Sequence, residues 1–156
     1  MASVEVKGVE RLVQRLLHIS QTRDVKEAMN KAVTLVHGQA KALAPVKTGN
    51  LSGNIHGKVF ENGKDIVGKV YTNVTYAPYV EFGTGIKGNG SYPNKDISLS
   101  YRSTPWVYTP DEGETFYYTK GQVAQPFMYP ALKRNEKKIK RILEEALHRD
   151  IKNNSK

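Results

Sequence analysis

The change from helical to strand spacing near Pro45 constrains the fold of this chain more than any other feature. Small and apolar residues recur at the spacing of one helix face over residues 24–43. Proline disfavours helical geometry in the residue before it, so this helix should end ahead of Pro45. The chain then alternates like strands over residues 55–60 and 66–73, on either side of an Asn-Gly pair that favours a hairpin turn.

The other segments complete the order of an α+β domain. Apolar residues at helical spacing predict one helix over residues 9–19 and another that begins near Pro130. We expect a short irregular or single-turn helical segment over residues 76–85, and a second hairpin from strands at residues 106–109 and 115–119. Because helices and antiparallel strands are segregated in this order, the sequence predicts the α+β class, with an antiparallel sheet packed against N-terminal and C-terminal helices.

We expect a single domain over residues 1–156, with residues 86–124 as an inserted hairpin excursion. Helical spacing also predicts which residues of the last helix are buried. They are Leu132, Ile139, Ile142, Leu143, Ala146 and Leu147.

Composition narrows the classes of protein. The absence of cysteine excludes disulfides, thiolate catalysis and Cys-ligated metal sites. No apolar run approaches the ~18 residues that span a membrane, so we expect a soluble protein with no membrane partner, made in a cytoplasm. The net charge of +9 favours polyanionic partners, which include nucleic acid, anionic lipid and acidic protein surfaces.

Three glycines, Gly83, Gly85 and Gly88, have the spacing G-x-G-x-x-G of a dinucleotide-binding loop. That loop needs a strand before it and a helix that opens at the glycines. Residues 89–93 follow here, with the sequence NGSYP, which does not open a helix, and no βαβ unit surrounds them. We therefore expect the glycines to let the chain bend, and we expect no nucleotide or other cofactor.

Catalytic and metal-binding patterns are missing from the sequence. The four histidines stand outside any H-E-x-x-H or H-x-H arrangement: His18, His37, His56 and His148. Glu81 lies in an apolar stretch, where a catalytic carboxylate and a structural acid are both conceivable. We favour a structural acid that binds backbone N–H groups or a basic residue in the adjacent loop, and we expect no enzyme activity.

The last helix carries a basic run: Lys133, Arg134, Lys137, Lys138, Lys140 and Arg141. One interpretation is a solvated face that is broken by acidic residues. The other is contact with DNA or with an acidic partner.

Aromatic residues gather in and before the second hairpin: Tyr101, Trp106, Tyr108, Phe116, Tyr117 and Tyr118. A two-stranded hairpin can place only one face on its parent domain, so the other face would expose large aromatic side chains. Such residues are enriched at protein interfaces. Base stacking is the alternative, but protein contact is the simpler interpretation.

Three stretches together resemble a known family. They are "APVKTGNLSGNI" at residues 44–55, "YAPYVEFGTG" at residues 76–85 and "QPFMYPAL" at residues 125–132. The chain resembles, from about Val4 to Ile151, the phage head–tail joining or tail-component family that is named for the tenth gene product of a lambdoid coliphage. Short members of that family pass almost directly from the second stretch to the third, so the excursion is a departure from its pattern.

The resemblance implies a structural virion protein of the neck of a long-tailed phage, present in the host cytoplasm during assembly. It implies a homo-oligomeric ring, with a hexamer expected, between the head connector or stopper and the tail terminator or tail tube proteins. Packaged DNA would be contacted only weakly. The alternatives are a tail terminator and, from a different class, a basic protein that binds nucleic acid independently of sequence.

The three stretches would then serve the architecture. Pro45 would stop the helix, and Thr48, Gly49 and Leu51 would turn the chain into the sheet. Aromatic side chains would fill the space between helix and sheet, next to the bend at Glu81 and Gly83: Tyr76, Tyr79 and Phe82. Pro126, Phe127 and Pro130 would set the direction of the last helix, with Phe127 buried against the sheet next to Tyr79 or Phe82.

Overall fold

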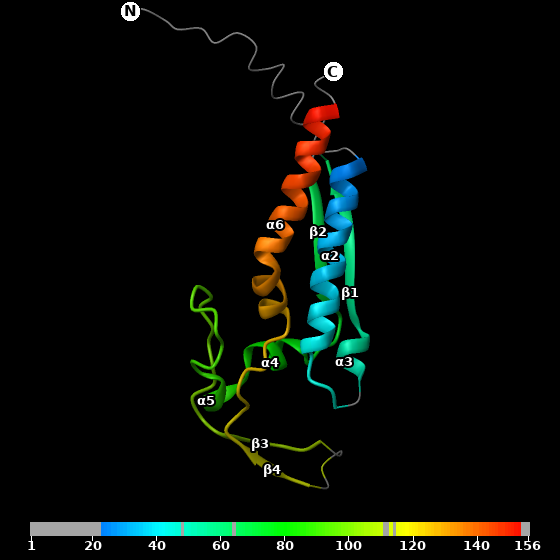
Figure 1. Ribbon diagram of the computed structural model, residues 1–156. Coiled ribbons are helices and arrows are strands. Elements are labelled where there is room, and N and C mark those ends of the chain that lie inside the picture. The colour runs from blue at the N-terminus through cyan, green and yellow to red at the C-terminus, as the bar shows by residue number, and fades with distance from the viewer. Residues whose placement is uncertain (1–22, 48, 64, 111–112, 114, 154–156) are drawn as a thin grey trace, which may run out of the picture. The chain divides into compact units, whose positions relative to one another are not determined.

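The computed structural model describes residues 23–47, 49–63, 65–110, 113 and 115–153. Its helices and strands are, in order, α2 (Arg23–Leu43), α3 (Asn50–Gly53), β1 (Ile55–Asn62), β2 (Asp65–Thr72), α4 (Ala77–Phe82), α5 (Gly85–Gly88), β3 (Trp106–Tyr108), β4 (Tyr117–Thr119) and α6 (Met128–Asn153) (Figure 1). The expected α+β class is confirmed by the long helices and the two antiparallel hairpins. The helix expected over residues 9–19 lies outside the described residues.

The chain divides into two compact units. The first consists of Met1–Val36, Gly57–Val70 and Asn135–Lys156, and the second of His37–His56 and Tyr71–Arg134. Helices α2 and α6 and both strands of the first hairpin contribute residues to both units. The organisation as a single domain stays a prediction.

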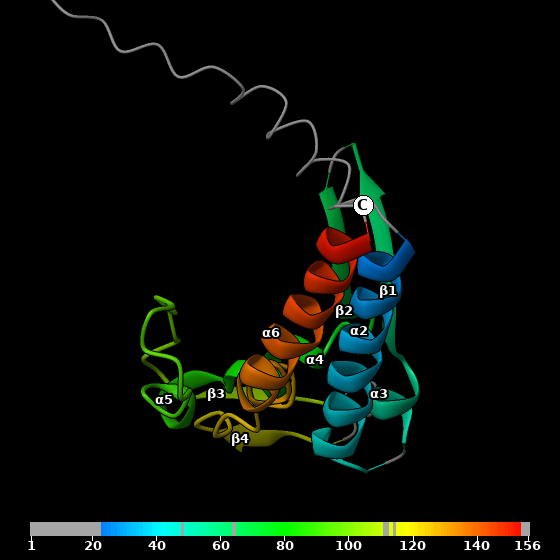
Figure 2. The same ribbon diagram turned by 45° about the horizontal axis from the view of Figure 1, so that its top comes forward.

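In the first unit, the described parts of α2 and α6 run side by side in opposite directions, and the β1–β2 hairpin lies against them (Figure 1, Figure 2). The Oδ2 of Asp24, at the start of α2, lies 3.8 Å from the Nε of Arg149, near the end of α6, which fits these opposite directions. The buried residues of α2 in this unit are small or β-branched: Val25, Ala28, Ala32, Val33 and Val36.

The hairpin approaches α2 closely at Gly68 of β2. A Cβ atom added there would lie 2.6 Å from Cγ2 of Val33 and 2.8 Å from Sδ of Met29. Only glycine therefore fits without displacing these two side chains, and the strand can lie directly on the helix.

The first half of the chain follows the sequence prediction closely. Helix α2 ends at Leu43, two residues ahead of Pro45, with a last backbone hydrogen bond from the Ala44 N–H to the Ala40 carbonyl at 2.9 Å. Strands β1 and β2 extend further toward the turn than expected, so the turn is tighter. Gly63 has a φ of 61° in this turn, which is the left-handed conformation that an Asn-Gly hairpin uses.

The second unit contains the short helices, the β3–β4 hairpin and the first turns of α6. Its largest fully buried side chains are Phe127 and Ile55. His37 Nε2 lies 2.8 Å from the Ile55 carbonyl and so ties the end of α2 to the start of β1. The burial predicted for Phe127 is confirmed, at 1% exposed. Its predicted neighbours, Tyr79 and Phe82, stay a prediction.

The predicted buried face of α6 is partly wrong. Leu132 and Leu147 are exposed, while Ala131 and Ala146 are fully buried. Successive residues of a helix are 100° apart, so this difference rotates the buried stripe by about one residue. The smallest side chains face inward because they let the helix approach its neighbours, and the longer leucines lie at the margin.

Candidate functional site

The junction of the excursion with the rest of the second unit is built around Glu81, at the end of α4. This carboxylate is 6% exposed. Its Oε2 accepts hydrogen bonds from the backbone N–H of Phe127 at 2.7 Å and of Met128 at 2.9 Å, and its Oε1 accepts one from the N–H of Tyr129 at 3.0 Å. The hydroxyl of Tyr92 donates a fourth, at 3.3 Å.

Glu81 therefore caps helix α6 from a distant part of the sequence. The first N–H groups of a helix have no partner within the helix, and the helix dipole makes this end attractive to an anion. A side chain just before the helix usually supplies that partner. Here Pro126 and Phe127 stand at that place, and neither has a side-chain acceptor. The interpretation of Glu81 as a structural acid that binds backbone N–H groups is confirmed.

Tyr92 completes this arrangement from within the excursion. Its ring packs edge-on to Phe82, with centroids 4.9 Å apart, and lies 5.8 Å from the ring of Tyr129. Burial, and secondarily the nearby Glu81 carboxylate, raises the pKa of Tyr92 to about 12. The hydroxyl, which is protonated at neutral pH in any tyrosine, therefore stays a hydrogen-bond donor to a higher pH than usual.

Backbone hydrogen bonds close the base of the excursion. Thr84 and Gln122 form an isolated antiparallel bridge, with N–H to carbonyl distances of 2.9 and 3.1 Å. The N–H of Gln125 donates to the Val80 carbonyl at 2.8 Å. The chain thus leaves and returns at adjacent positions, as expected of an insertion.

The glycines of the G-x-G-x-x-G stretch serve this junction. Gly83 has a φ of 77°, and a Cβ atom there would lie 2.7 Å from the backbone nitrogen of Ala124. Gly85 has a φ of 59°, and a Cβ atom there would lie 2.6 Å from the ring of Trp106. The stretch makes a single helical turn, α5, which the sequence did not predict. These glycines allow the bend and the close approach of two chain segments.

The aromatic set divides between inward and outward positions. Trp106 packs on Gly85, with the guanidinium of Arg102 5.4 Å from its ring centroid. The hydroxyl of Tyr101 donates to the Phe82 carbonyl at 2.8 Å. These two residues therefore help to hold the excursion in the second unit.

The remaining aromatic residues of the set are exposed on the hairpin. Strand β3 pairs with β4 in the register Tyr108 with Tyr117, whose rings are 5.7 Å apart, and Val107 with Tyr118. Phe116 and Tyr118 are 72% and 67% exposed. An assembly role for this surface stays a prediction.

Residues of the other two motifs are placed as follows. Gly49 precedes α3 with a φ of 77°, and Leu51 is buried, which suits a loop that turns the chain toward β1. Thr48 lies outside the described residues. Pro126 comes just before α6 and Pro130 lies in its first turn, where the missing N–H costs no hydrogen bond.

The predicted filling of the core by Tyr76 and Tyr79 is wrong. These side chains are 40% and 60% exposed. Helix α4 directs Ala77 and Glu81 inward, four residues apart on one face, so Tyr79 falls on the other face. Only Phe82 of the three aromatic residues packs inside the unit, against Tyr92.

The basic run of α6 is exposed along the helix. Lys140 and Arg141 stand 3.8 and 3.5 Å from Glu144 and Glu145, one turn further on. Exposed pairs of this kind contribute little to stability. This part of the run fits the solvated-face interpretation, and contact with DNA or an acidic partner stays a prediction.

The first half of the chain is similar to a known protein family. The family described as "Bacteriophage HK97-gp10, putative tail-component" matches residues 9–83. Residues 9–83 are therefore similar to a phage tail-component family. No curated protein and no solved structure matches the chain significantly.

The match confirms the resemblance to the HK97 gp10-like family over a narrower stretch than expected. It includes the first motif and ends at Gly83, close to where the excursion begins. The third motif lies outside it. Glu81 nevertheless links the matched stretch to the third motif, since it belongs to the second motif and binds the backbone of the third.

Sequence reasoning missed Tyr92 and Ser91. The Ser91 hydroxyl donates to the Gly88 carbonyl at 2.6 Å and accepts from the Ala124 N–H at 2.9 Å, so it fastens both sides of the junction. The only signal was an aromatic residue next to a proline in an otherwise polar stretch. Among the described residues, no group of His, Cys, Asp and Glu is arranged to hold a metal ion, and no helix has the length and apolar character to cross a membrane.

Proposed function

We propose that this protein is a structural component of the neck of a long-tailed phage, where it acts in head–tail joining or tail completion as a ring. The observation that carries the proposal is the match of residues 9–83 to a phage tail-component family. This similarity supports a virion location and a role that depends on shape instead of catalysis.

The exposed surface of the β3–β4 hairpin supports self-association. Val107, Phe116 and Tyr118 are apolar or aromatic residues that are exposed on a hairpin of only two short strands. Large aromatic side chains contribute much of the energy of protein interfaces. In a ring, a neighbouring copy would cover them. We propose a hexamer, and we propose that the head connector or stopper and the tail terminator or tail tube lie on either side.

The test measures assembly and stability together. The mass of the purified protein is measured in solution, and rings are sought by electron microscopy, alone and with isolated tails. In the double variant Phe116→Ser, Tyr118→Ser we expect an unchanged melting temperature and loss of rings or of infectious particles. Tyr79→Ser is the control, because it removes an aromatic side chain of similar exposure from another surface.

If the double variant still completes infectious particles, the hairpin is not an assembly element. If purified tails lack the protein at the end that joins the head, the assignment to the neck is wrong. The position of the protein in the particle also distinguishes a completion protein from a tail terminator.

The exposed basic run of α6 favours a second candidate function, which is binding of nucleic acid without regard to sequence. Phosphate contacts weaken as salt rises because counterions are released on binding. We expect only weak DNA binding, which decreases steeply with salt and is reduced by Lys137→Glu with Lys138→Glu. Tight binding to DNA of any sequence would support the second candidate against the neck protein.

A further inference from the structure

We propose that the outer face of the β1–β2 hairpin receives the aromatic face of the β3–β4 hairpin from a neighbouring copy of the chain. The outer face consists of Lys58, Phe60, Val67 and Lys69, and the aromatic face consists of Val107, Phe116 and Tyr118. This inference rests on the proposed ring and deepens it, because the ring by itself does not say which surface receives the aromatic side chains.

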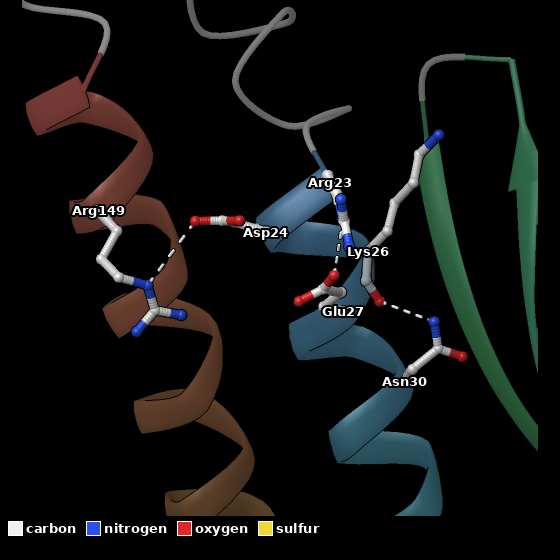
Figure 3. A network of polar contacts seen from close by, with 6 residues as sticks. All are labelled: Arg23, Asp24, Lys26, Glu27, Asn30 and Arg149. Atoms are coloured by element: carbon white, nitrogen blue, oxygen red, sulfur yellow. Dashed lines mark hydrogen bonds and ion pairs between the residues drawn. The ribbon is translucent and has the colours of Figure 1, made fainter.

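Two contacts within the first unit identify the side of the β1–β2 hairpin that faces α2. A Cβ atom at Gly68 would meet the side chain of Val33. The side chain of Lys26 extends from α2 toward the hairpin (Figure 3), where its Nζ lies 2.8 Å from Oε1 of Glu61. Successive residues of a strand point to opposite faces of the sheet. The strand neighbours of Gly68 and Glu61 therefore point away from the helix.

Both strands contribute to the same outer face. Only residues 63 and 64 separate β1 from β2, so equal counting from this turn places His56 opposite Tyr71. Their ring centroids are 5.7 Å apart, which agrees with this register. The same count places Phe60 opposite Val67, and it places the two lysines of the outer face opposite each other.

The outer face is exposed and is basic as well as apolar. Phe60 and Val67 are 39% and 41% exposed. The Nζ of Lys58 lies 5.2 Å from the ring centroid of Phe60, so one lysine already contacts an aromatic ring. Like charges that stand opposite each other on a sheet are destabilising. Lys58 and Lys69 would therefore gain from a partner that offers them further aromatic rings.

The β3–β4 hairpin offers such rings on one of its faces. Val107 pairs with Tyr118, so these two side chains share a face, and strand alternation directs Trp106 to the other one, where it packs on Gly85. Phe116 stands two residues before Tyr118 and points the same way by the same alternation. All three side chains of the aromatic face are exposed.

A ring of more than two copies joins two different surfaces of each chain. A surface that packs on its own equivalent gives a closed pair, whereas a ring forms when one patch of each copy binds a different patch of the next copy. The aromatic face of the β3–β4 hairpin consequently needs a receiving surface elsewhere on the chain.

The outer face is complementary to the aromatic face in charge. Residues 106–119 include no lysine, arginine or histidine, whereas the outer face has two lysines. The net charge of +9 makes a contact between two basic surfaces unfavourable, so a surface without cations is the better partner. Lysine ammonium groups are also attracted to the faces of aromatic rings.

The two faces match in form as well. Each is the exposed side of a two-stranded hairpin. Sheets pack face to face about 10 Å apart, a spacing that large side chains fill. Phe116 and Tyr118 would then lie on Phe60 and Val67, with the lysine stems along their edges.

The test blocks one face at a time and then mixes the blocked chains. Phe60→Thr with Val67→Thr blocks the outer face and keeps residues that suit a strand. Phe116→Ser with Tyr118→Ser blocks the aromatic face. We expect each variant alone to lose the rings that wild type forms. A 1:1 mixture should form dimers and nothing larger, because it contains one intact face of each kind, on different chains. Sedimentation measures these masses.

Ile97→Thr with Val123→Thr is the control, because it removes two apolar side chains of similar exposure from another surface. It should form rings as wild type does. Rings formed by the outer-face variant overturn the proposal and leave the ring itself standing. If those rings no longer join tails, another tail protein is the occupant. A mixture that stays monomeric, or that forms rings, also overturns the proposal. If wild type forms no ring, alone or with tails, the proposed function fails as well.

A second variant tests the lysines and leaves the apolar pair intact. Lys58→Gln with Lys69→Gln is placed in the chain whose aromatic face is blocked, and the Kd of the mixed dimer is measured. We expect this Kd to rise roughly tenfold. The same two changes at Lys137 and Lys138 of α6 should leave it unchanged. Equal values for the two pairs would overturn the role of the outer lysines. If Phe60→Thr with Val67→Thr melts below its control, this second variant decides the proposal.

Discussion

Replacement of Glu81 is the most direct test of how the family stretch is joined to the last helix. Glu81→Ala removes the acceptor of three backbone N–H groups, of which that of Phe127 is buried. A hydrogen bond to a charged group contributes about 1.5–3 kcal/mol, and a buried donor without a partner costs about 1–3 kcal/mol. Because water can reach two of the three donors after truncation, we expect a loss of about 3–5 kcal/mol in the free energy of unfolding.

Glu81→Gln should have a smaller effect of about 1–3 kcal/mol. The amide keeps one oxygen, which can replace Oε2 and accept from Phe127 and Met128. Its NH₂ group would then face the N–H of Tyr129, and two donors would meet. The negative charge at the start of α6 would also be lost. Tyr92 can accept from the NH₂ group, which limits the damage.

Chemical denaturation with circular dichroism measures both variants, and Glu144→Ala is the matched control. Glu144 is an exposed glutamate of α6 whose contact with Lys140 is 3.8 Å long, so its loss should cost less than about 0.5 kcal/mol. For a chain of this size, the loss in Glu81→Ala corresponds to roughly 10 °C in melting temperature. If Glu81→Ala unfolds at the same denaturant concentration as the control, Glu81 is not the cap of α6 and the reasoning is refuted.

Three other outcomes can be checked. The pKa of Tyr92 is raised from 10.0 to about 12. Its contribution to the free energy of unfolding is therefore complete below pH 10 and is lost as the pH rises toward 12. The difference in this free energy between wild type and Tyr92→Phe, measured by denaturation, should shrink over this range by up to about 2–3 kcal/mol. Gly68→Ala should destabilise the protein by about 1–3 kcal/mol through overpacking. Gly38→Ala should stabilise it by about 0.5–1 kcal/mol, because a Cβ atom at this position in α2 would meet no group of another segment within 4 Å; the opposite order of the two variants in thermal melts would contradict the packing. Replacing residues 107–118 by an Asn-Gly turn should leave the free energy of unfolding within about 1 kcal/mol of wild type. A larger loss would show that the hairpin is part of the core.

The regular elements could be predicted from the sequence because local signals determine them. Pro45 ends α2, the Asn-Gly pair sets the first hairpin, and Pro130 marks the first turn of α6. Glu81 could be assigned to backbone N–H groups because a carboxylate in an apolar stretch must find donors. The donors themselves could not be named, since they are 46–48 residues further along the chain.

Side-chain direction within short or fully helical segments was less predictable. Tyr79 looked like a core residue by type, but the phase of α4 is fixed by inward-facing Ala77 and Glu81. The burial predicted for Leu132 and Leu147 was also wrong, because small alanines of α6 allow closer packing than leucines do. Tyr92 was missed because its role depends on Glu81 and Phe82, which it meets only through the bend at α5.

The excursion combines a part that belongs to the core of its unit with a part that projects. Its ends meet at the Thr84–Gln122 bridge, so a longer or shorter connection can be accommodated there, because the entropy of closing a loop grows only slowly with its length. Tyr92 nevertheless donates to Glu81 from inside the excursion, which ties the first part to the cap of α6. No interaction described above links residues 107–118, the hairpin beyond Trp106, to the cap of α6. Variation in the length of this hairpin would therefore leave the cap of α6 intact, and under the proposed assembly role it would change the surface offered to a neighbouring copy.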